Sequence, residues 1–113
     1  MKHISILIPN GAVLGSVEGP RQVFTEANKF ITSTGKSDLC KVQLVGLTEQ
    51  VPVCGGKYTV NSDVLTSDVK KTDLIIIPAL DGDMKQMIEQ NKDFIPWIIE
   101  QYKGGAEVAS LCL

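Results

Sequence analysis

The segment Leu74-Ile75-Ile76-Ile77-Pro78 decides the fold class of this chain of 113 residues. It places four large apolar residues in a row, with no alternation between apolar and polar positions. A half-buried strand alternates, so an unbroken apolar run predicts a strand that is buried on both faces. Such strands are typical of parallel sheets that carry helices on both sides.

Strands and helices alternate around this segment. Further strands are expected at residues 4–8, 41–48 and 106–111, where apolar runs are bounded by glycine, proline or asparagine. Gly55-Gly56, between two β-rich arms, predicts a hairpin at residues 51–60. Helices are expected at residues 20–33, with Pro20 in the first turn, and at 81–91 and 93–103. The apolar residues that predict these helical faces are Val23, Phe24, Ala27, Phe30 and Ile31, then Met84, Met87 and Ile88, then Ile95, Ile98, Ile99 and Tyr102.

The order β-α-β-hairpin-β-α-α-β predicts an α/β fold of the flavodoxin-like kind, a parallel sheet sandwiched by helices with a small β-hairpin. The last expected strand reaches almost to the end of the chain, with nothing after it to cover it. We therefore expect these residues to be an incomplete part of a longer domain.

Composition narrows the class of protein. The chain has 43% hydrophobic and 21% charged residues and a net charge of −2, which is typical of a soluble globular protein. Its lysines and arginines are scattered, which argues against a nucleic-acid surface on these residues. No apolar segment is long enough for a membrane span. Three widely spaced cysteines predict neither a disulfide framework nor a metal site, so we expect a cytoplasmic protein without metal or cofactor.

The loops that leave the strands are the expected place for a ligand. In such a sheet, ligands bind beyond the carboxyl ends of the strands. The segments at residues 9–19, 78–82 and 112 onward should therefore converge. The candidate ligand-binding residues are Asn10, Ser16, Pro78, Ala79 and Leu80.

Two residues are candidates for chemistry. Cys112 ends a strand, and a helix starting there would lower the pKa of its thiol, which makes Cys112 a candidate nucleophile. A buried structural cysteine is the alternative. Glu18 is a candidate acid near it, or simply a first-turn acid that favours the helix dipole. The one histidine, His3, precedes the first expected strand at the opposite edge, so these residues supply no Cys–His pair.

Four motifs resemble the DJ-1/PfpI superfamily, whose fold is that of class-I glutamine amidotransferases. They are I-x-I-L-I-P-x-G at residues 4–11, G-P-x-x-V-F-x-x-A-N at 19–28, D-L-I-I-I-P-A at 73–79 and G-G-A-E-V-A-S-L-C at 104–112. The second and fourth look most like the N-terminal sensor domain of GlxA-type regulators of the AraC family.

The resemblance implies a role for the chain and a domain boundary. It implies that residues 1–113 are the N-terminal portion of a DJ-1/PfpI-like domain, with the rest of that domain and any helix-turn-helix domain absent. It also implies that Cys112 is the family cysteine. Related isonitrile hydratases have an acid where this chain has Ser16, and Glu18 lies in a different register. This departure argues against an enzyme.

Three hypotheses follow. The first is a ligand-sensing domain that binds a small molecule near Cys112, forms a homodimer, and controls DNA binding by a separate helix-turn-helix domain. The second is a stand-alone cysteine-dependent enzyme, such as an isonitrile hydratase, a glyoxalase or an amidase. The third is a redox sensor or chaperone-like protein that acts through oxidation of Cys112.

Overall fold

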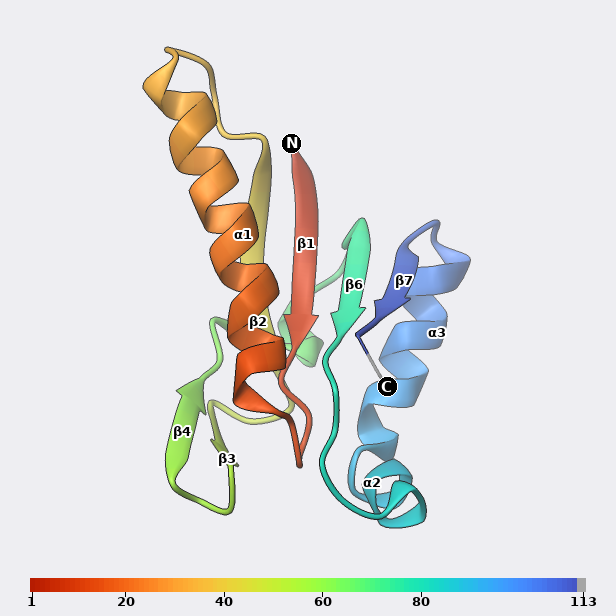
Figure 1. Ribbon diagram of the computed structural model, residues 1–113. Coiled ribbons are helices and arrows are strands. Elements are labelled where there is room, and N and C mark those ends of the chain that lie inside the picture. Colours follow the sequence, from red (N-terminus) through yellow and green to blue (C-terminus); the bar gives the residue numbers. More distant parts are fainter. Residues whose placement is uncertain (112–113) are drawn as a thin grey trace.

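A five-stranded parallel sheet with the strand order β5-β2-β1-β6-β7 forms the centre of the protein (Figure 1). The structure, a computed structural model, describes residues 1–111. The strands are β1 (Lys2–Leu7), β2 (Cys40–Gly46), β3 (Gln50–Val53), β4 (Tyr58–Asn61), β5 (Val64–Leu65), β6 (Leu74–Ile77) and β7 (Glu107–Ser110). The helices are α1 (Leu14–Ser33), α2 (Met84–Gln90) and α3 (Ile95–Lys103), with short 3₁₀ turns η1 (Thr66–Asp68) and η2 (Lys92–Phe94). The predicted α/β fold with a parallel sheet and a small hairpin is confirmed.

Strand β6 is covered on both faces, as its sequence predicts. Ile76 packs into a cluster with Ile4 of β1 and Val17 of α1, whereas Ile75 packs on the other side with Phe94 and Trp97. Helix α1 therefore covers one face of the sheet, and η2 with α3 covers the other. Because successive side chains of a strand point to opposite faces, only an unbroken apolar run can serve both clusters.

The predicted hairpin is formed by β3 and β4, which pair antiparallel on either side of Cys54, Gly55 and Gly56. Val51 and Val53 are buried and join the cluster beneath α1, while Pro52 between them is exposed. The alternation along β3 therefore fixes which face of the hairpin packs against that cluster.

Helix α1 begins earlier than its sequence predicts. It starts at Leu14, so that Pro20 lies inside the helix and not in its first turn. Hydrogen bonds from outside the helix hold the extra turns: the Val13 N–H donates to the Ala79 carbonyl at 2.9 Å, and the Ser16 hydroxyl accepts from the Ala79 N–H at 2.8 Å. These contacts offset the helix-breaking tendency of proline, and a local pattern does not reveal them.

The prediction of the buried face of α1 is wrong in part. Phe24 is half-buried and packs against the core cluster on the sheet, and Ile31 is half-buried, but Val23 and Phe30 are 65% and 70% exposed. The apolar residues of α1 occupy two faces of the helix, and the sheet covers only one of these faces.

The buried faces of α2 and α3 also differ in part from the faces that the sequence predicts. Met87 is buried and Ile98 is half-buried, as predicted, and Trp97 is buried although its spacing did not predict it. Both helices are short, and each turns only one or two apolar residues toward the sheet. The predicted inward residues that are exposed instead are Met84, Ile88, Ile95, Ile99 and Tyr102.

A buried polar network ties α3 to the central strands of the sheet. The Gln101 side chain accepts from the Thr72 N–H at 2.9 Å and donates to the Lys70 carbonyl at 3.1 Å. The Ser5 hydroxyl donates to the Thr72 hydroxyl at 2.8 Å, and Gln43 of β2 donates to Ser5 at 3.4 Å. Since buried polar groups must find partners, this network selects one register of the strands and of α3.

Candidate functional site

The loops that follow β1 and β6 meet at the carboxyl edge of the sheet. Ala12 and Leu80 form an antiparallel bridge, and the Asp81 N–H donates to the Gly11 carbonyl at 2.8 Å. Gly11 has a φ of +80°, which glycine adopts without strain. The convergence predicted for these two loops is confirmed.

The third segment of the predicted site begins beside the second. Strand β7 pairs in parallel with β6, so that Ser110 lies opposite Ile77. The Leu111 N–H then donates to the Ile77 carbonyl at 2.9 Å. Leu111 thus lies at the carboxyl edge of the sheet, while Cys112, the candidate nucleophile, lies outside the described residues.

Ser16 lies inside the candidate site and has a structural partner there. It sits in the first turn of α1, where its hydroxyl accepts a hydrogen bond from the Ala79 N–H at 2.8 Å. Ala79 and Leu80 are half-buried, but Pro78 is fully buried. Ser16 therefore joins α1 to the loop after β6. Pro78 is buried in the core beneath that loop.

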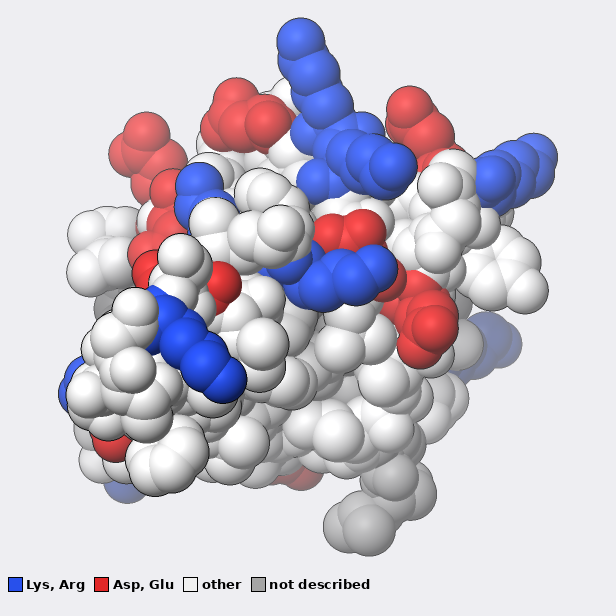
Figure 2. Space-filling model, turned by 90° about the horizontal axis from the view of Figure 1, so that it is seen from above, with Lys and Arg blue, Asp and Glu red and all other residues white. Residues whose placement is uncertain are grey.

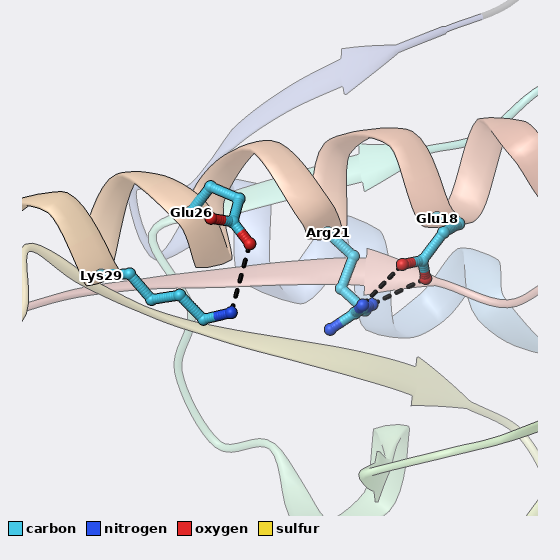
Figure 3. A network of polar contacts seen from close by, with 4 residues as sticks. All are labelled: Glu18, Arg21, Glu26 and Lys29. Atoms are coloured by element: carbon cyan, nitrogen blue, oxygen red, sulfur yellow. Dashed lines mark hydrogen bonds and ion pairs between the residues drawn. The ribbon is translucent and has the colours of Figure 1, made fainter.

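Glu18 is held by a neighbouring arginine (Figure 3). It lies in the second turn of α1, not at its start, and both of its carboxylate oxygens accept from the Arg21 guanidinium, one of them at 2.7 Å. This hydrogen bonding lowers the pKa of Glu18, and the smaller effect of burial opposes it. A carboxylate held in this way stays ionised and is unsuited to donate a proton at neutral pH.

Asn10 is a tether between the loop after β1 and the end of α2. Its N–H donates to the Asn91 side-chain oxygen at 2.7 Å, and its carbonyl accepts from the Asn91 amide at 3.0 Å. The Asn10 side chain donates to the Gln90 carbonyl at 3.2 Å. Its backbone groups and its side-chain nitrogen are thus bonded to the end of α2 and to Asn91, the residue that follows it. Asn91 carries no signal in the sequence that would have predicted this role.

An apolar pocket of about 250 Å³ lies between the loops and the two short helices. Pro9 and Leu80 of the converging loops form one wall. Residues of α2, η2 and α3 form the other, among them Phe94 and Ile95. Among the described residues that line the pocket, Asn91 has the only amide side chain, and its polar atoms are already bonded to the backbone of Asn10 and Met87. The pocket would therefore bind a ligand through its shape and its apolar surface.

The opposite end of the sheet carries the amino ends of the strands, where the Asp73 N–H donates to the His3 carbonyl at 2.9 Å. Figure 2 views that end, where acidic and basic side chains are mixed. His3 lies there inside β1, not before it as predicted, and its backbone N–H donates to the Asp73 carboxylate at 2.8 Å. Within residues 1–111, no cluster of histidine, cysteine and acidic side chains could hold a metal ion, and no helix is long and apolar enough to cross a membrane.

Comparisons with known proteins identify the fold. No protein-family model and no curated protein matches the chain. Among solved structures, a candidate transcriptional regulator from Vibrio parahaemolyticus is similar with a TM-score of 0.76 at 16% identity, over 96% of this chain and 55% of that one. DJ-1beta of Drosophila melanogaster gives a TM-score of 0.69 at 18% identity, over 96% and 54% of the two chains.

An AraC family transcriptional regulator from Pseudomonas putida is also similar, with a TM-score of 0.64 at 10% identity, over 97% of this chain and 64% of that one. The chain thus shares the fold of DJ-1 superfamily proteins, which include regulators and enzymes, and the predicted resemblance is confirmed at the level of the fold. It spans between 54% and 64% of the length of these three solved structures.

Proposed function

We propose that residues 1–113 are the N-terminal portion of the ligand-sensing domain of an AraC-family transcriptional regulator. The observation that supports this most directly is the joining of the loops after β1 and β6 at the carboxyl edge, with the end of β7 beside them. In open α/β sheets this edge is where ligands bind. Two structures of the same fold are those of a transcriptional regulator and of a candidate one.

The contacts of the candidate residues favour binding over catalysis. Ser16 is bonded to Ala79, Glu18 to Arg21, and Asn10 to Asn91. A general acid or base must be able to exchange a proton with its substrate, which a carboxylate clamped by a guanidinium does poorly. In this proposal the contacts of Ser16 and Asn10 fix the loops, and the loops shape a site for a small molecule near Cys112.

The proposal includes two partners. A second copy of the protein forms a homodimer, and DNA is bound by a separate helix-turn-helix domain of the full-length protein. Binding of the small molecule changes how the two DNA-binding domains are held. The net charge of −2 on residues 1–113 agrees with DNA contacts lying elsewhere.

Two measurements distinguish this function from that of a superfamily enzyme. One is the conversion of candidate substrates, and the other is the reactivity of the Cys112 thiol. We expect methylglyoxal, an isonitrile and glutamine each to be left unchanged by the full-length protein. We also expect its Cys112 thiol to titrate near the ordinary value of about 8.5 in an iodoacetamide alkylation series, with Cys54→Ser as the matched control variant. If the full-length protein converts any of these three compounds, and if Cys112→Ala abolishes that conversion, the protein is an enzyme and the proposed regulatory function is wrong.

A further inference from the structure

The chemistry of the apolar pocket between the converging loops and the short helices limits what can bind there. None of the described residues that line the pocket carries a charge, and the one amide side chain among them is that of Asn91. Both amide hydrogens of Asn91 are used, one on the Asn10 carbonyl and one on the Met87 carbonyl, and its oxygen accepts from the Asn10 N–H. The lining side chains therefore offer a polar ligand neither a free donor nor a charge.

The size of the pocket suits a small molecule. Its volume is about 250 Å³. A buried apolar cavity of about 150 Å³ stays dry and holds one benzene molecule, because water inside it would find no hydrogen-bonding partner. The larger volume of this pocket accommodates a substituted benzene or a small aliphatic molecule.

The pocket is open to solvent on one side. Ile88 of α2 and Ile95 of α3 line it and are 56% and 44% exposed, whereas Leu7 and Phe94, which also line it, are buried. A ligand can therefore enter past the two isoleucines without unfolding either helix. These exposed apolar side chains lose contact with water when a ligand covers them, which favours binding of an apolar molecule.

Met87 connects the pocket to the two loops at the carboxyl edge. It lines the pocket and is buried, and it lies against Gly11 and Gly82, where an added Cβ would meet its side chain. Pro9 and Leu80 of the same two loops line the pocket directly. Because both loops contribute to one wall, a ligand that fills the pocket stabilises the arrangement in which that wall is held against α2.

We propose that this pocket binds a small, uncharged, apolar molecule, and that its occupation holds the loops after β1 and β6 in the arrangement seen here. Ile77 of β6 also lines the pocket, and its carbonyl accepts from the Leu111 N–H. The pocket therefore reaches the strand to which Leu111, the residue before Cys112, is bonded. This inference rests on the proposed function and deepens it, because it names the class of molecule that the domain senses.

Toluene and phenol are the probes, and isoleucine methyl spectra of the full-length protein are the readout. Toluene should shift the methyl signals of Ile88, Ile95 and Ile98, which line the pocket, and should leave those of Ile31 and Ile99, which do not. Phenol has the same number of heavy atoms but must give up the hydrogen bonds that its hydroxyl makes with water. We therefore expect phenol to bind about tenfold more weakly than toluene.

A charge at the rim of the pocket supplies the second arm of the test. Ile88→Glu should weaken toluene binding at least about tenfold, because it places a carboxylate beside the ligand. Ile99→Glu is the matched control, since Ile99 is 48% exposed on α3 and does not line the pocket, and it should leave the dissociation constant unchanged.

Hydrogen exchange at Asn10 tests the effect on the loops. A ligand that binds one arrangement only stabilises that arrangement by a factor set by its concentration relative to its dissociation constant. With toluene at about ten times its dissociation constant, the Asn10 amide should therefore exchange about tenfold more slowly. An unchanged rate in the toluene-bound protein would show that the pocket does not control the loops.

The outcomes separate this pocket from the proposed function. The inference is wrong if toluene leaves the pocket methyls unshifted, if phenol binds as tightly, or if Ile88→Glu binds toluene as the wild type does. It is also wrong if nuclear Overhauser contacts show that residues beyond 113 fill the pocket. Each of these results leaves a ligand-sensing domain standing, with a polar ligand elsewhere at the edge. The proposed function fails on a different result, which is conversion of a substrate that Cys112→Ala abolishes.

Discussion

Asn91 should hold the loop after β1 in place, and removing its side chain should release that loop. Asn91→Ala deletes both bonds to Asn10, the acceptor of its N–H at 2.7 Å and the donor to its carbonyl at 3.0 Å, and also the bond from the Asn91 amide to the Met87 carbonyl at 2.9 Å. Each such bond contributes about 0.5–1.5 kcal/mol net, and water can replace part of what is lost because the two bonds to Asn10 are exposed. We therefore expect the free energy of unfolding to fall by about 1–2 kcal/mol.

Hydrogen exchange at Asn10 reports on the loop directly. If opening of the loop becomes easier by about 1.4 kcal/mol, the Asn10 amide should exchange about tenfold faster, while the amides of the central strand β1 keep their protection. Asn91→Asp should lie between wild type and Asn91→Ala in both measurements, because a carboxylate still accepts from the Asn10 N–H but donates nothing.

Asn61→Ala is the matched control for this experiment. Asn61 is exposed in β4, and its side chain makes a 3.4 Å contact with Gln50. Its removal should change the free energy of unfolding by less than about 0.5 kcal/mol. Equal losses from Asn91→Ala and Asn61→Ala, or an Asn10 amide that exchanges at the wild-type rate in Asn91→Ala, would refute the role of Asn91 as a tether.

Three further changes test other parts of the structure. Gln101→Leu should lower the free energy of unfolding in urea by about 1–3 kcal/mol, because the buried Thr72 N–H loses its acceptor, and an unchanged value would contradict the buried network. Gly11→Ala should lower it by about 1–3 kcal/mol in the same assay, because φ is positive there and the new Cβ meets the Met87 sulfur. A hydrogen bond from the His3 backbone N–H lowers the pKa of Asp73, so its contribution to stability is present above the ordinary aspartate pKa and is lost as the pH falls through the lower folded value. Asp73→Asn should therefore flatten the acid limb of a plot of unfolding free energy against pH, and a limb of wild-type slope would argue against this assignment.

The pattern of the sequence determined the class of the fold. An unbroken apolar run at residues 74–77 suits a strand covered on both sides, and glycines at 55 and 56 separate two strands that pair as a hairpin. Because the carboxyl ends of parallel strands lie at one edge, the same pattern also placed the loops after β1 and β6 together. These inferences depend on periodicity and chain direction, which can be read from the sequence itself.

Tertiary contacts decided which residues of that edge are free. Ser16, Asn10 and Ala79 were predicted near the site, but the bond between Ser16 and Ala79 was not predicted, and neither was Asn91, the partner of Asn10. The start of α1 at Leu14 and the exposure of its outer apolar side chains have the same origin, since both depend on which surface the helix meets. Helical spacing tells which residues share a face, but only the packing of one element on another selects the face that is buried.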